Sequence, residues 1–156
     1  MLDHLGFAPV LFAERQLIRR QLVAGVTNAV PVELGANALG AALGDRPLRH
    51  AVEATGSTAV LDQLLGLVAG GARIAMVGIF HGKSEISANA IVEREIELRG
   101  CSVFADEQAR AVELLPGLAP KLARLVSPPI GLDSVPAAYR DLIEGRAPAL
   151  KTIIRP

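Results

Sequence analysis

The chain has little of what several classes of protein need. It has a single cysteine and no tryptophan, aromatic residues make up only 3% of its 156 residues, and 16 basic residues balance 16 acidic ones. One cysteine excludes an internal disulfide and fits a reducing compartment. Scarce aromatics argue against a stacking platform for single-stranded nucleic acid. A formal net charge of zero removes the bulk attraction to nucleic acid or anionic membrane.

The sequence also lacks a long apolar run and a basic leader. No run approaches the roughly 20 apolar residues needed to span a bilayer. The opening residues, Met-Leu-Asp-His, do not form the basic start of a signal peptide. We therefore expect a cytoplasmic protein that binds neither membrane nor nucleic acid. What the sequence does have is apolar content, 51% of its residues, which is enough for the core of one domain.

The pattern between residues 50 and 80 predicts a strand, a helix and a second strand. Residues 50–56 are a short, mostly apolar run that ends in glycine, and residues 74–80 are an apolar run without polar alternation. Between them, apolar residues recur with helical spacing at positions 60, 61, 64, 65 and 68. Ser57 can cap this helix and Gly70-Gly71 can end it. Strands that are apolar throughout are typical of a parallel sheet buried on both faces, so we expect a right-handed βαβ unit.

Shorter patterns predict further elements on both sides of this unit. We expect strands at residues 9–13, 28–32, 95–104 and 150–154, and helices at residues 14–23, 37–43, 88–94, 107–115, 120–126 and 133–144. Pro116 and Gly117 are expected to end the helix that begins at residue 107. The order of these elements predicts an α/β fold with a doubly wound, Rossmann-like parallel sheet, C-terminal helices and a closing strand.

Four pieces of the sequence resemble the nucleotide-binding domain of the medium-chain, zinc-type alcohol and polyol dehydrogenases. They are Val-Glu-Ala-Thr-Gly at 52–56, the glycine-led apolar run at 70–79, Arg-Glu-Ile-Glu-Leu-Arg-Gly at 94–100, and Ala-Leu-Lys-Thr-Ile-Ile at 149–154. The butanediol, sorbitol and threonine dehydrogenase branch is the most similar. The resemblance implies an oxidoreductase that passes hydride between an alcohol and the cofactor NAD, with zinc polarising the alcohol oxygen.

Two features of that family are missing from the sequence. One cysteine and three scattered histidines do not provide the spacing of a zinc site, which the family carries in an N-terminal domain. The family's acidic ribose-binding residue follows a G-x-G-x-x-G turn by about 20 residues. Glu14 matches that acid, and residues 1–13 are too few to hold the turn. We therefore expect residues 1–156 to form a single partial dinucleotide-binding domain that lacks its first strand and the zinc domain.

The resemblance also implies which residues contact the cofactor. Glu14 would accept hydrogen bonds from the ribose hydroxyls of NAD and repel the 2′-phosphate of NADP, while Arg19 would lie against the adenosine ribose or weaken that preference. Thr55, Gly56 and the backbone of 77–79 would surround the nicotinamide. The full implied set is Glu14, Arg19, Thr55, Gly56, Val77, Gly78, Ile79, Phe104 and Lys151, with no catalytic and no metal-binding residue.

Each of these residues also has a structural interpretation. Glu14 suits the start of a helix, where the dipole favours a carboxylate. Gly78 suits tight packing of a helix on the sheet, and Phe104 suits the core. Lys151, which the resemblance places at the cofactor pyrophosphate, suits a solvated strand end.

Three hypotheses for the whole chain stay open. The chain is a truncated alcohol dehydrogenase, inactive alone; or a non-enzymatic dimerisation module that pairs through the edge near residues 85–98; or part of a longer reading frame with a wrongly assigned start. Loss of the first strand would leave a gap of about 9–10 Å, which is two strand spacings. The segment before residue 37 would then be poorly anchored, because an unpaired inner edge has no partner to hold it.

Overall fold

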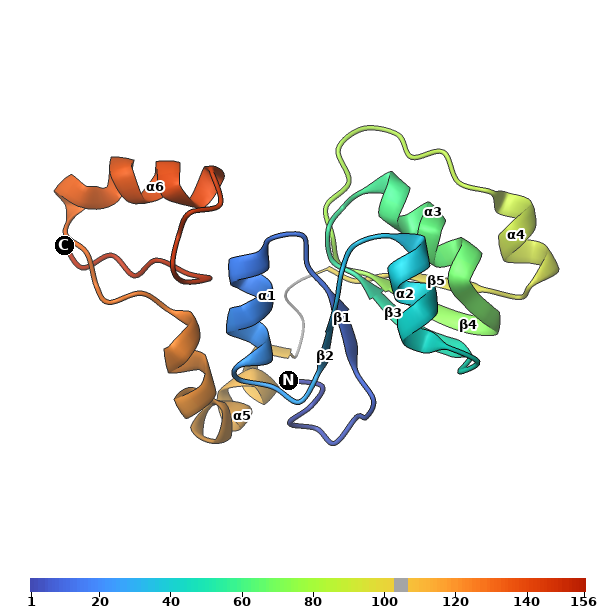
Figure 1. Cartoon of the computed structure of the whole chain (residues 1–156), viewed down its shortest axis with the longest axis horizontal. Coiled ribbons are helices and arrows are strands. Elements are labelled where there is room, and N and C mark those ends of the chain that lie inside the picture. Colours follow the sequence, from blue (N-terminus) through green and yellow to red (C-terminus); the bar gives the residue numbers. More distant parts are fainter. Residues whose placement is uncertain (103–106) are drawn as a thin grey trace. The chain divides into compact units, whose positions relative to one another are not determined.

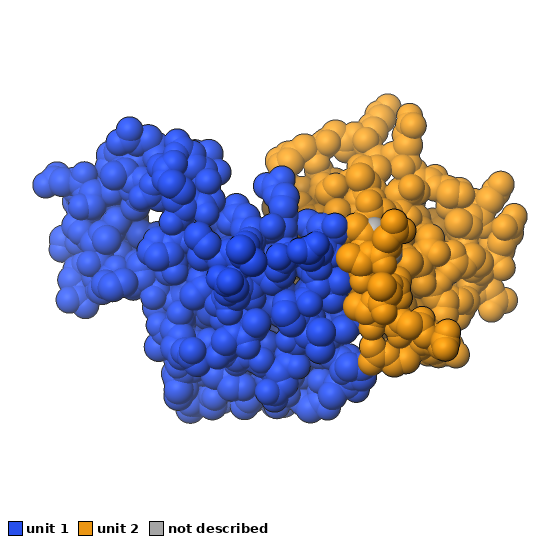
Figure 2. Space-filling model, in the orientation of Figure 1, with its two compact units in different colours: residues 1–34, 106–156 blue, residues 35–105 orange. Residues whose placement is uncertain are grey.

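Figure 1 shows the computed structural model of the chain, which describes residues 1–102 and 107–156. The chain divides into two compact units, which Figure 2 colours separately. Unit 1 consists of residues 1–34 and 106–156, and unit 2 consists of residues 35–105. All named strand pairs in the described residues are parallel, so the predicted α/β class with parallel sheets is confirmed.

Unit 2 contains the predicted strand–helix–strand unit. Its elements are α2 (Ala36–Leu43), β3 (Leu48–Glu53), α3 (Thr58–Leu67), β4 (Val68–Met76), α4 (Ala88–Glu93) and β5 (Glu97–Gly100). The three strands form one sheet in the order β3-β4-β5. Ala51 lies opposite Ile74, which lies opposite Leu98. The ends of β3 and β4 are level, because Glu53 pairs with Met76. Strand β5 is shorter than the predicted 95–104, of which residues 103 and 104 lie outside the described part.

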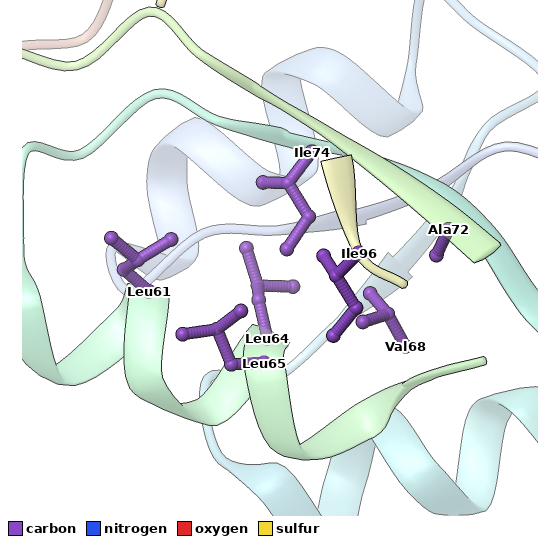
Figure 3. Close-up of a cluster of buried hydrophobic side chains, with 7 residues drawn as sticks. All are labelled: Leu61, Leu64, Leu65, Val68, Ala72, Ile74 and Ile96. Carbon is purple, nitrogen blue, oxygen red and sulfur yellow. The ribbon is translucent and has the colours of Figure 1, made fainter. Parts of the chain in front are cut away.

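The core of unit 2 forms where α3 packs against the sheet. Figure 3 shows the three leucines of α3 with Ile74 of β4 and with Ile96, and all five side chains belong to one buried cluster. The buried cluster is Leu61, Leu64, Leu65, Val68, Ala72, Ile74 and Ile96. Four of its members, at 61, 64, 65 and 68, are positions that the helical spacing predicted to face inward.

The predicted end of this helix is wrong. Helix α3 ends at Leu67, and Val68 is already extended and only 1% exposed, so Gly70 and Gly71 lie inside β4. The extended backbone of Val68 places its side chain in the core, so the helix ends before Gly70. Arg94 Nη1 donates to the Leu65 carbonyl at 2.6 Å and so satisfies one of the last carbonyls of α3. Ser57 stands at the N-cap, but its side chain makes no capping hydrogen bond.

The predicted burial of residues 74–80 on both faces is also wrong. Strand β4 ends at Met76, and the Val77 and Ile79 side chains that follow are 49% and 79% exposed. Within the sheet, Ala72 and Ile74 are buried while Arg73 between them is exposed and forms an ion pair with Glu97 on β5. This alternation means that one face of the sheet packs under the helices and the other carries polar groups.

Unit 1 is built from both ends of the chain. Its elements are β1 (Leu11–Ala13), α1 (Leu17–Ala24), β2 (Val30–Val32), α5 (Glu107–Leu122), η1 (Ala123–Leu125), η2 (Leu132–Ser134) and α6 (Val135–Ile143). Strands β1 and β2 form a two-stranded parallel sheet. The short strands 9–13 and 28–32 and the helix 14–23 were therefore predicted correctly in type and nearly in extent.

Two expectations for unit 1 are corrected. Helix α5 does not stop at Pro116 and Gly117 but continues to Leu122 with two prolines inside it. A proline removes one backbone donor, and the carbonyl it leaves can bind water because α5 buries no residue. The closing strand at 150–154 is not part of a sheet: it makes two isolated parallel bridges, Val126 with Lys151 and Ile130 with Ile154.

Several strand edges are unpaired in the described residues. Strand β1 pairs only with β2, and β3 and β5 pair only with β4. Each of these three strands therefore has one edge without a strand partner. Pairing of two copies through residues 85–98, which reach into the start of β5, stays a prediction.

Candidate functional site

The carboxyl ends of β3 and β4 carry a cluster built around Glu53. Its carboxylate accepts a hydrogen bond from the Thr55 backbone N–H at 2.7 Å and one from the Gly56 N–H at 3.1 Å. The Thr55 hydroxyl also donates to Glu53, and in turn accepts from the Ser57 N–H at 3.1 Å. Together these bonds fix the turn between β3 and α3. Open α/β sheets bind their ligands at such carboxyl ends.

Two glycines make this cluster compact. Gly56 has a φ of +68°, and a Cβ there would overlap the Ile79 carbonyl. A Cβ on Gly78 would overlap the Gly56 nitrogen and stand 2.6 Å from Glu53 Oε2. The backbone therefore needs glycine at both positions for the two strand ends to meet, which is the packing interpretation of Gly78.

The structure brings together five of the residues implied by the resemblance, Thr55, Gly56, Val77, Gly78 and Ile79. The Val77 and Gly78 N–H groups both donate to the Glu53 carbonyl, at 2.8 and 3.1 Å, so these two donors are already used. Within the described residues, the Val77 carbonyl has no hydrogen-bond partner. A ligand at this end of the sheet would thus meet a free carbonyl and two exposed apolar side chains, Val77 and Ile79.

Glu14 directly follows β1 in unit 1. Its Oε1 accepts from the Gln16 N–H at 2.8 Å, and its backbone carbonyl accepts from Arg20 Nη1 at 3.4 Å. One carboxylate oxygen therefore organises the turn into α1, which agrees with the structural interpretation. The other oxygen has no partner in the described part of the chain.

Arg19 and Lys151 line one groove in unit 1. The groove has a volume of about 360 Å³, and its remaining lining is mostly apolar: Ile130, Val135, Ala138, Tyr139, Leu142, Leu150, Thr152 and Ile154. No acidic group pairs with either cation among the residues that the structure describes. Two unpaired cations beside an apolar wall suit a ligand that joins an anion to a flat ring. Phe104, the ninth implied residue, lies outside the described residues.

Glu53 is the residue of this cluster that the sequence analysis did not single out. It is a single acid at the end of a largely apolar run, followed at once by Thr-Gly. That pattern is visible in the sequence, but the backbone donors that justify a buried acid come together only in the fold. Within the described ranges, no three His, Cys, Asp or Glu side chains gather to hold a metal ion.

Comparison with known protein families identifies the family of this chain. The profile of the family described as zinc-binding dehydrogenase matches residues 4–116. The chain belongs to the zinc-binding dehydrogenase family. No curated protein sequence matches it. The matched segment includes β1 to β5, and so contains the Glu53 cluster but not Lys151.

Several solved structures have the same fold as this chain. One is 2R,3R-butanediol dehydrogenase from Bacillus subtilis, 22% identical with a TM-score of 0.83 over 99% of this chain. Another is an alcohol dehydrogenase from Escherichia coli solved with NADH, 16% identical with a TM-score of 0.82 over 97% of the chain. A third is a zinc-binding dehydrogenase from Sinorhizobium meliloti solved with NADP, 22% identical with a TM-score of 0.74 over 96% of the chain. The chain spans about half the length of these proteins, 46%, 45% and 45%.

The family name implies zinc, and the described residues do not fit it. A catalytic zinc needs three protein ligands from Cys, His or acidic side chains at one point, and no such group of three is present in the described ranges.

None of the described helices has the length and apolar character to cross a bilayer. A cytoplasmic location stays a prediction.

Proposed function

We propose that this chain is the NAD-binding part of an alcohol dehydrogenase, and that on its own it binds the dinucleotide without oxidising an alcohol. The observation that carries the proposal is the groove shared by Arg19 and Lys151. These residues, far apart in the sequence, were assigned separately to the ribose and the pyrophosphate. That both line one groove, without acidic partners in the described residues, supports a common anionic ligand.

The adenosine half of the cofactor would bind to unit 1. Arg19 and Lys151 attract phosphate, and the free oxygen of Glu14 can accept hydrogen bonds from ribose hydroxyls. Its negative charge repels the 2′-phosphate of NADP, so NAD is favoured. Arg19 opposes this preference because it can pair with that phosphate.

When bound, nicotinamide supplies the hydride acceptor. We derive no step through zinc, because the described residues do not fit it, and we therefore expect no alcohol oxidation by this chain alone.

Isothermal titration calorimetry of the full chain with ADP-ribose tests the first half of the proposal. ADP-ribose contains the ribose and pyrophosphate but not the nicotinamide. Changing both Arg19 and Lys151 to Gln should weaken binding by roughly tenfold or more, as expected from loss of charged hydrogen bonds. The matched control changes Arg15 and Arg155 to Gln, which removes the same charge from exposed positions outside the groove.

No binding of ADP-ribose to the wild-type chain would overturn the proposed function. Equal losses in the two double variants would show that the groove is not the site. The second half is tested by NADH absorbance after mixing the chain with NAD and butane-2,3-diol. Turnover by the purified chain would contradict the expected inactivity.

A further inference from the structure

One wall of the groove in unit 1 is the apolar face of α6. Val135, Ala138, Tyr139 and Leu142 line the groove, and their spacing of three and four residues places them on one face of the helix. Such a face ordinarily packs into a core, yet α6 has no buried residue and Tyr139 is 65% exposed. The apolar face of α6 is therefore left partly exposed to solvent beside the groove.

The positive charge in this groove is not balanced by the protein. Arg19 and Lys151 line it, and no acidic residue lines it among the residues that the structure describes. Neither cation forms an ion pair in that part of the chain. The volume of about 360 Å³ lies within the range of small-molecule sites, about 300–1,000 Å³. Charge complementarity therefore calls for a small anion, and the wall calls for an apolar tail on it.

We propose that the groove binds a small carboxylate with an unbranched apolar tail, such as octanoate. The carboxylate accepts charged hydrogen bonds from Arg19 and Lys151, and the tail covers the apolar face of α6. All lining residues belong to unit 1, so the site needs nothing from unit 2. The inference goes beyond the proposed function and does not depend on it. Where both hold, the carboxylate and the dinucleotide need the same two cations and exclude each other.

A series of ligands tests the tail and the head separately on the full wild-type chain. Calorimetry with butanoate, hexanoate and octanoate should give a dissociation constant that falls about two- to fourfold for each added methylene, because each buries apolar surface. Octan-1-ol has the same tail without the charge and should bind at least about tenfold more weakly than octanoate. An affinity independent of tail length, or an alcohol that binds as tightly as octanoate, would overturn the inference.

Two neighbouring alanines of α6 provide a matched pair for the wall. Ala138 lines the groove, whereas Ala137 is exposed and does not line it. Ala138→Leu fills space that the tail needs, so it should weaken octanoate about fivefold or more and butanoate by less than about twofold. Ala137→Leu adds the same side chain outside the groove and should leave both ligands unchanged. Equal effects of the two variants would overturn the inference.

Two lysines provide the matched pair for the head. Lys151→Gln should weaken butanoate and octanoate by the same factor of about tenfold, because it removes a charged hydrogen bond and leaves the wall intact. Lys83→Gln removes the same charge from an exposed position in unit 2 and should change neither. If the two variants gave equal losses, the attraction would come from net charge, and the inference would be overturned.

Competition separates this inference from the proposed function. Octanoate should raise the apparent dissociation constant of ADP-ribose, and binding of both without competition would overturn the inference, because it would place octanoate outside the groove. Binding of octanoate alone would overturn only the proposed function, and binding of ADP-ribose alone would overturn only the inference. Light scattering tests a second copy as the occupant: a dimer that octanoate neither binds nor dissociates would assign the face of α6 to self-association and overturn the inference.

Discussion

The two units of this chain are stabilised by different interactions. Unit 2 buries a continuous apolar cluster between α3 and β4. Unit 1, in its described residues, buries only three apolar side chains, Val26, Val32 and Ala149. It relies more on polar contacts between distant segments, such as Lys121 with Asp3 at 3.3 Å and Arg124 with the Gly25 carbonyl at 2.8 Å.

This difference indicates which unit a bound ligand should stabilise more. Exposed ion pairs contribute little to stability, whereas a buried apolar cluster contributes a large share. Unit 2 should therefore be stable without ligand. Unit 1 has the groove lined by Arg19 and Lys151, which have no acidic partner among the described residues. Ligand binding adds stability to the state that binds the ligand. A dinucleotide should therefore stabilise unit 1 more than unit 2.

The largest expected effect comes from the core of unit 2. Leu65 is 2% exposed, so Leu65→Ala should lower the free energy of unfolding by about 2–5 kcal/mol, because it leaves a cavity. The same change at Leu132, which is 63% exposed in unit 1, should cost less than about 1 kcal/mol. Hydrogen exchange of the amides in β4 measures the loss of stability in the Leu65→Ala variant. Similar losses from the two variants would contradict the difference between the units.

The next effect concerns the contact between the strand ends. Gly78→Ala should destabilise unit 2 by about 1–3 kcal/mol, because its Cβ would overlap the Gly56 backbone. Gly100→Ala at the end of β5 is the matched control, since a Cβ there meets no atom within 4 Å. Urea denaturation followed by the exchange of β3 and β4 amides compares them. A stable Gly78→Ala variant would show that the strand ends are not held together.

A direct comparison of the units uses the wild-type chain. Amides of β4 should exchange more slowly than those of β1, because β4 is central in its sheet and β1 has one unpaired edge. Adding ADP-ribose should slow exchange in β1 and α1 more than in β4. Uniform slow exchange across both units without ligand would remove the distinction.

The smallest effect is expected from pH. The Asp3 carboxylate accepts a backbone hydrogen bond from Asn28 and pairs with Lys121, and these contacts hold its pKa below the ordinary 3.8 although desolvation opposes them. The stabilisation is therefore full above 3.8 and is lost as pH falls through the lower, folded-state pKa. Asp3→Asn should lower the thermal midpoint of unit 1 slightly at neutral pH and leave it unchanged in strong acid. A difference that persists in acid would contradict this origin.

The parts of the fold that the sequence predicted are those set by local periodicity. The leucines of α3 recur at helical spacing, and they are buried as the spacing requires. The end of α3 could not be predicted, because burial of Val68 and the hydrogen bond from Arg94 depend on the tertiary fold. The continuation of α5 past Pro116 was missed because proline stops a helix less strictly where the freed carbonyl can bind water.

The candidate site was predicted only in part. Thr55 and Gly78 were assigned through family resemblance, and the structure places them in one cluster. The groove between Arg19 and Lys151 could not come from spacing, since the two residues are brought together by folding of both chain ends into unit 1. The burial of Glu53 was not predicted, because a carboxylate is expected to be exposed to solvent unless hydrogen-bond donors surround it. Its donors at Thr55 and Gly56 are known only from the structure.

The wall of that groove has one practical consequence. Tyr139 lines it and is 65% exposed. The chain has one tyrosine and no tryptophan, so all of its tyrosine fluorescence comes from this single side chain. A dinucleotide that enters the groove should quench that emission. The protein thus contains its own fluorophore beside the proposed binding site, and occupancy can be followed without attaching a dye.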